Sequence, residues 1–234
     1  VRVFEGDVRL GVGSGSEKMG AVNLGTQQGA WYAQLGLSYL DADGFPLPKG
    51  FKDYKAKPTD TGSQRENAYR TDQRLSFKVG LTPNATDEYA LGYVRQDGEK
   101  GNPVYTGQST SGIRYWQWPF WDKDSVYFIS STRIGQNNVL KARVFHDTYK
   151  NSILAFSNAS YTTQLNNTSF PSVYNDSSTG ASLELANYAV ANHALRLAVH
   201  IKEDKHNDSN PSSPTKNYRD TTTSLAVEDS ITLA

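Results

Sequence analysis

The apolar residues of this chain recur at every second position, and this period constrains the fold more than any other feature. From 195 to 201 the odd positions are all Leu, Val or Ile, while the even positions are Arg, Ala and His. The same alternation is found over 8–12, 31–39, 75–81, 89–94 and 140–144. A period of two is that of a β-strand with two unlike faces. No apolar stripe with a period of 3.6 residues has comparable length, so the pattern predicts an all-β, antiparallel chain.

About ten strands are expected. Their approximate spans are 6–13, 19–26, 29–41, 70–81, 86–97, 124–135, 138–154, 178–188, 193–205 and 218–232. Several are longer than the ~5–6 residues of a common globular strand. They suit the ~9–11 residues that a tilted strand needs to cross a bilayer. The lengths therefore favour a transmembrane β-barrel.

The connections between these strands alternate in length. Short ones are expected at 27–28, 82–85, 135–137 and 189–192, and long ones at 42–69, 98–123, 155–177 and 206–217. Consecutive antiparallel strands turn at opposite ends of a sheet, so nearly all the long connections gather at one end. Outer-membrane barrels have short periplasmic turns and long external loops, which is the same arrangement.

Charged residues within the strands keep to the polar positions. They are Arg9, Lys78, Lys141, Arg143, Glu184 and Arg196. A charge facing lipid near the bilayer midplane costs roughly 2–4 kcal/mol, whereas one facing a hydrated lumen costs little. A soluble antiparallel sheet with one face in a core predicts the same alternation. That alternative is left open, and strand length and loop sorting favour the membrane barrel.

Composition excludes several other classes of protein. The 234 residues carry 24 basic and 24 acidic side chains, which gives no support for nucleic-acid binding. The lack of Cys excludes disulfide scaffolds, thiolate zinc sites and Cys nucleophiles within this sequence. No run approaches the ~18–20 apolar residues of a membrane helix. Because the sequence starts at Val1 and its last residues read like the middle of a strand, we expect a piece of a longer protein.

Several segments resemble the TonB-dependent outer-membrane receptors. The strongest is 80–103, GLTPNATDEYALGYVRQDGEKGNP, which looks like that family's strand, short periplasmic turn and following strand. The segments 11–15, 29–45, 118–123 (WPFWDK) and 170–174 (FPSVY) are also similar to parts of that family. The resemblance implies a 22-stranded barrel closed by an N-terminal plug, whose short box contacts the TonB complex. Neither plug nor box is recognisable here, so residues 1–234 are expected to be one barrel segment, the first half.

The same resemblance implies a function. It suggests the barrel portion of a receptor that imports a scarce nutrient, first of all a ferric chelate (siderophore), across the outer membrane of a Gram-negative bacterium. The implied partners are the chelate, the TonB complex through the absent plug, and outer-membrane lipid, with no nucleic acid. No cofactor, resident metal or catalytic residue is expected. The alternatives are a small porin or adhesin barrel, an outer-membrane protease and a soluble β-sandwich.

The candidate ligand-binding residues are aromatic and basic side chains of one expected outer loop. They are Arg114, Tyr115, Trp116, Trp118 and Trp121, together with the neighbouring Phe120 and Lys123. Aromatic faces suit planar chelates, and the two cations would attract an anionic one. The competing interpretation, which we favour at this point, is an aromatic girdle at headgroup level. Tyr105 is a further candidate for the outer vestibule, although packing is the simpler role for a lone loop Tyr.

Histidine gives little further indication of a site. Asp204, His206 and Asp208 could point to one side of a strand and form a rim metal site or a His–Asp pair. Neither zinc-ligand spacing nor a nucleophile motif accompanies them, so solvated rim charges are expected. The glycines of 11–15 lack the following helix that a phosphate-binding loop needs, and we reject that role.

Overall fold

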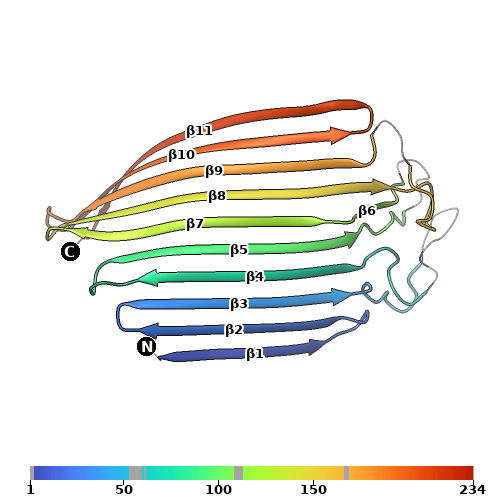
Figure 1. Ribbon diagram of the computed structural model, residues 1–234, viewed down its shortest axis with the longest axis horizontal. Helices are drawn as coiled ribbons and strands as arrows, with labels where there is room; N and C mark the ends of the chain where they lie inside the picture. The colour runs from blue at the N-terminus through green and yellow to red at the C-terminus, as the bar shows by residue number, and fades with distance from the viewer. Residues whose placement is uncertain (1–2, 53–59, 61, 108–112, 166–168, 234) are drawn as a thin grey trace.

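The computed structural model describes all residues except 1–2, 53–59, 61, 108–112, 166–168 and 234. The described residues contain eleven β-strands in one sheet and no helix (Figure 1). The predicted all-β, antiparallel class is therefore confirmed. Among the residues that the structure describes, no helix is long and apolar enough to cross a membrane.

The strands run through most of the chain. Their bounds are β1 Phe4–Val12, β2 Lys18–Gln28, β3 Trp31–Ala42, β4 Arg70–Leu81, β5 Glu88–Gly101, β6 Trp116–Trp118, β7 Trp121–Ile134, β8 Asn138–Ala155, β9 Ser172–Asn187, β10 His193–Asn210 and β11 Ser213–Ile231. Every strand pairs antiparallel with its neighbours. β5 pairs with both β6 and β7, and β8 pairs with both as well.

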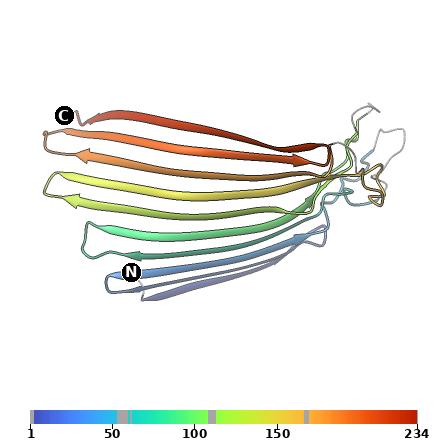
Figure 2. The same cartoon turned by 45° about the horizontal axis from the view of Figure 1, so that its top comes forward.

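The sheet is open in the described residues. β1 pairs only with β2, and β11 pairs only with β10, so each leaves one edge without a strand. Figure 2 shows the strands as one curved layer, with the irregular connections gathered at one end. An uncapped strand edge is a template for pairing with further chain. Closure into a barrel would require each of these edges to pair, with further chain or with the other edge.

Three of the expected boundaries were wrong. The short strand β6 was missed, so there are eleven strands rather than about ten. The expected long connection at 206–217 is strand apart from the turn at 211–212, and β9 begins at 172 rather than 178. These extensions are polar at nearly every position, so they lack the alternation that identifies a half-buried strand.

The register brings apolar positions of neighbouring strands into line. One row of directly paired residues consists of Ala33, Val79, Leu91, Phe128, Val144, Ala181 and Ile201. A row on the opposite face consists of Gly36, Ser76, Val94, Ser125, Asp147, Ser178, Asp204 and Asp220. We call the two sides of the sheet the apolar face and the polar face. All six strand charges expected on the polar positions lie on the polar face.

The apolar face is the more exposed of the two. On β10, Leu197 and Ile201 are 44% and 50% exposed, while the residue before each of them, Arg196 and His200, is partly buried. A soluble sheet shows the reverse, because its apolar face packs on a core. Within the described part of the chain, the sheet is a single layer and nothing covers this face.

Three aromatic rings on the polar face lie over glycines of the adjacent strand. Tyr127 is paired with Gly92, and a Cβ atom built on Gly92 would lie 2.3 Å from the ring of Tyr127. Tyr32 over Gly80 and Phe145 over Gly180 repeat the arrangement. Because glycine has no side chain, each ring packs against the backbone instead of projecting from the polar face.

The turn between β4 and β5 is joined to β7 by one carboxylate. Asp87 accepts a hydrogen bond from the backbone N–H of Arg133 at 2.8 Å, and its other oxygen accepts one from Asn84 at 3.0 Å. These bonds favour the ionised form and lower the pKa of Asp87, with the Arg133 N–H contributing most. The short-turn end of the sheet is thus held by side-chain as well as backbone bonds.

Gly92→Ala is expected to destabilise the sheet, because the new methyl group would overlap the Tyr127 ring and force it off the backbone. Overpacking of this kind costs about 1–3 kcal/mol. Urea titration of the folded fraction measures the change. Gly20→Ala is the matched control, since its Cβ would meet Leu10 at an ordinary 3.6 Å. Equal losses in the two variants would contradict a role for the ring contact.

Candidate functional site

Aromatic side chains form a connected cluster at the long-loop end of the sheet. Trp116 and Trp118 come from β6, and Trp121 begins β7. The ring centroid of Trp118 lies 6.3 Å from that of Trp116 and 6.0 Å from that of Trp121. Phe170 contacts Trp116 at 5.7 Å, and Tyr149 of β8 contacts Trp121 at 5.4 Å. We call these five residues the aromatic ledge. The rings are mostly edge to face, which is a favoured aromatic geometry.

The pairing register places the ledge on the polar face. Trp118 is paired with Lys100, and Trp121 is paired with Asn151. Both partners share the face of Lys78 and Lys141, because they lie an even number of residues from polar-face positions on β5 and β8. A membrane girdle would need the opposite, apolar face. The girdle interpretation that the sequence favoured is therefore wrong for Trp116, Trp118 and Trp121.

An amide side chain holds β6 in place. Asn67 Nδ2 donates to the backbone oxygens of Asn102 at 2.7 Å and Trp116 at 2.8 Å. The Asn67 Oδ1 atom accepts a hydrogen bond from Gln117 Nε2 at 3.1 Å. The three-residue strand is thereby bonded to the segments before β4 and after β5, so the two β6 tryptophans occupy defined positions.

Two cations lie against the ledge. Lys100 Nζ is 3.4 Å from the ring centroid of Trp121 and 5.2 Å from that of Trp118. Arg114 Cζ lies 4.5 Å from the Trp116 centroid. Such cation–π contacts hold positive charge at the surface of the rings. The ledge therefore offers apolar ring surface and positive charge at one place.

The other predicted residues are divided between packing and exposure. Tyr115 contacts Tyr161 at 6.2 Å, and Tyr161 contacts Phe156 at 5.4 Å, which makes a second small cluster beside the ledge. Phe120 is partly buried in the connection between β6 and β7. Tyr105 is 54% exposed, and its ring lies against Gly107, so it both packs locally and presents ring surface.

Lys100, Tyr149 and Phe170 were not among the expected site residues. Tyr149 lies on the expected strand at the same parity as Arg143, so the alternation already placed it on the polar face. Lys100 lies beyond the expected end of its strand at 97, although counting on by twos from Gln96 would have reached it. Phe170 belongs to a loop, and no periodic signal could have located it.

Asp204, His206 and Asp208, for which no site was expected, do not form a common site. His206 Nδ1 is 2.8 Å from Asp176 Oδ1, and the imidazole stacks between Tyr174 and Tyr218. Asp204 instead accepts from Ser178 at 2.6 Å and pairs with Lys202 at 2.7 Å. Within the described residues, no group of three or more His, Asp or Glu side chains could hold a metal ion.

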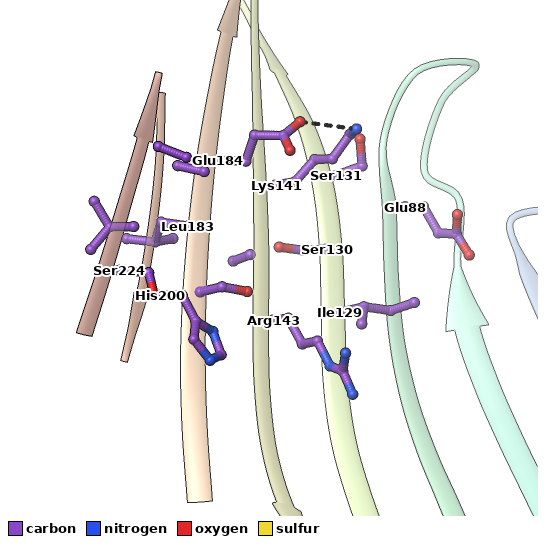
Figure 3. Close-up of a pocket in the computed structure, with 15 residues that line it drawn as sticks. Glu88, Ile129, Ser130, Ser131, Lys141, Arg143, Leu183, Glu184, His200 and Ser224 are labelled. Atoms are coloured by element: carbon purple, nitrogen blue, oxygen red, sulfur yellow. Dashed lines mark hydrogen bonds and ion pairs between the residues drawn. The ribbon is translucent and has the colours of Figure 1, made fainter. Parts of the chain in front are cut away.

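The polar face also carries depressions. One of about 470 Å³ lies nearer the short turns, and Figure 3 shows Lys141 and Glu184 joined across it, with a 3.2 Å ion pair. Arg143 and His200 enter it from β8 and β10. A second depression, about 460 Å³, is lined by Lys123, Tyr149 and His206. The polar face is thus an uneven wall of charges rather than a packed core.

Comparison with known proteins places the chain in no family. No family model matches it, and no curated protein sequence matches it. Among solved structures it is similar to the copper transporter OprC, with a TM-score of 0.48 and 14% identity over 99% of this chain and 43% of that one. The chain thus spans less than half the length of that protein. A likeness this distant is too weak to argue from, so function is argued from the sheet itself.

Tyr161 is expected to titrate late, because burial, with a smaller contribution from Tyr115, raises its pKa to about 12. A raised pKa favours the neutral phenol in the folded loop. The resulting stabilisation is complete below about pH 10 and is lost as the pH rises toward 12. Absorbance titration at 295 nm of the wild type minus Tyr161→Phe isolates this group. A difference curve centred near pH 10 would contradict the burial.

Proposed function

We propose that this chain is part of the transmembrane barrel of an outer-membrane nutrient receptor in a Gram-negative bacterium. In this proposal the apolar face contacts lipid and the polar face lines the lumen. The observation that carries it is the exposure of the apolar face, where uncovered Leu, Val, Ile and Phe side chains alternate with the charged and polar residues of the other face. Lipid removes the cost of exposing that apolar surface, because hydrocarbon tails are as apolar as the side chains.

The dimensions of the apolar face support lipid as its partner. On β3 the outward positions from Trp31 to Tyr39 are all apolar, a stretch of about nine residues. At ~3.4 Å per residue and a tilt of ~45°, this length covers ~22 Å, close to the ~25 Å apolar band of such barrels. A barrel is also the one sheet architecture that leaves no unpaired edge in lipid.

We further propose that the aromatic ledge binds an anionic, chelated nutrient, with a ferric chelate as the first candidate. Ring surface and the charges of Lys100 and Arg114 suit a planar anionic ligand. Uptake would then need a plug and energy from the TonB complex, both contributed by parts outside this chain. Binding and release suffice for transport, so we propose no covalent chemistry for these side chains.

A charge introduced on the apolar face should prevent stable folding in the membrane, whereas the same charge on the polar face should not. Leu197→Arg is expected to cost about 2–4 kcal/mol, since residue 197 lies in the middle of the apolar column of β10. The adjacent Ala198→Arg, which faces the opposite way, is the matched control. Outer-membrane fractionation and the mobility shift on unheated detergent gels report folding. Equal tolerance of both variants would contradict lipid contact.

Removal of one ledge ring should weaken ligand binding. Trp121→Ala is expected to reduce affinity for the bound chelate about tenfold, because the change removes ring surface and the cation–π partner of Lys100. Fluorescence quenching against a panel of tricatecholate and hydroxamate ferric chelates measures affinity. Trp31→Ala, on the apolar face at the other end of the sheet, should leave binding unchanged. Ion conductance without binding of any chelate would favour a passive porin instead.

A further inference from the structure

Two cations lie directly opposite each other at the border of the apolar face that is nearer the long loops. Lys205 of β10 is paired in register with Arg219 of β11. Like charges at directly opposed positions of an antiparallel pair are destabilising. Both belong to the apolar face, since each lies an even number of residues from the outward positions 201 and 223. The apolar column of β10 ends at Ile201, and Glu203 is the next outward residue.

One carboxylate serves both cations. Lys205 Nζ lies 3.0 Å from one oxygen of Glu203, and Arg219 Nη2 bonds the other oxygen. The Lys205 and Arg219 side chains are 52% and 67% exposed, whereas that of Glu203 is 25% exposed. Both oxygens of the carboxylate are therefore occupied, and the two exposed cations together carry more N–H donors than it accepts. The cluster carries one positive charge in excess.

Other cations near this border are balanced. Arg95, in the equivalent row on β5, makes two 2.8 Å bonds to Asp97 and is paired in register with Asp124. Lys150 of β8 is paired in register with Asp122. The excess positive charge of this border is thus concentrated on β10 and β11, where hydroxyl groups of Ser177 and Thr221 occupy adjoining outward positions.

We propose that Lys205 and Arg219 form a binding site for the phosphate group of a membrane lipid. The inference rests on the proposed function, since it needs the apolar face to lie in lipid. An Arg guanidinium suits the bidentate binding of phosphate, and Lys adds a second point charge. A phosphate between them would add a second counter-charge to the single one that Glu203 supplies.

The position of the site favours a lipid over a dissolved anion. Lys205 and Arg219 face the same way as the apolar column, and Lys205 lies two outward positions beyond Ile201, where that column ends on β10. This is the level of the headgroups when the column lies in hydrocarbon. The chains of a lipid bound there would contact Ile201 and Thr223, while Lys205 and Arg219 bound its phosphate. A free anion would gain only the charge contact, which salt screens at an exposed site.

The test measures lipid retention by the intact protein purified from outer membranes in detergent. Native mass spectrometry with added bis-phosphorylated lipid A gives the bound fraction, and the same lipid without its phosphates is the probe control. The double variant Lys205→Gln/Arg219→Gln is expected to lower retention of the phosphorylated lipid at least tenfold. The dephosphorylated lipid should bind wild type and variant equally weakly.

Lys202→Gln is the matched control, because Lys202 lies on the same strand but on the polar face, paired with Asp204. It should retain the lipid as the wild type does. Unchanged retention in the double variant, or an equal loss in Lys202→Gln, would overturn the proposed phosphate site. If inorganic phosphate displaced the lipid at equal concentration, the site would be one for free anions. Absence of the protein from the outer membrane would instead refute the proposed function.

Discussion

The structure depends on keeping register across every strand pair of a single-layer sheet. In a strand with period-two side chains, a slip of one residue exchanges the two faces completely. Here ten long strands keep their apolar positions in line, from Val8 on β1 to Val227 on β11. No second layer within the described residues corrects an error in that alignment. The backbone ladder therefore determines which residues form the apolar face and which form the polar face.

On the polar face, large rings pack over glycines and leave the space above the sheet open. Large rings on a lumen wall would normally project into the lumen, but Tyr32, Tyr127 and Phe145 lie down over cross-strand glycines. Flattened rings cover backbone that would otherwise meet water, and they support the neighbouring strand laterally. The ledge tryptophans are held differently, by one another and by the Asn67 bonds near β6, so their faces and edges stay at the surface.

Alternation along the sequence was enough to predict strand type, the face of each strand charge and most strand positions. The reason is that a sheet with one apolar and one polar face has an apolar residue at every second position of each strand. It failed where both faces are polar, as in the extension of β10 to Asn210 and the start of β9. It also misplaced the Trp cluster. The composition WQWPFW fits a girdle as well as a ledge, and only the pairing of Trp118 with Lys100 distinguishes the two.

The two faces also differ in what they reveal about position along the strand. On β10 the polar face carries Arg196, His200, Asp204 and Asp208 from one end to the other, so its chemistry does not mark where the strand lies in a membrane. The apolar face changes within one step, from Ile201 to Glu203. In the proposed barrel, lipid tails would favour Ile201 and exclude Glu203, so this step would fix the depth of the strand. The opposed cations Lys205 and Arg219 would then follow at the level where a bilayer presents its phosphates, and these would add to the counter-charge that Glu203 supplies.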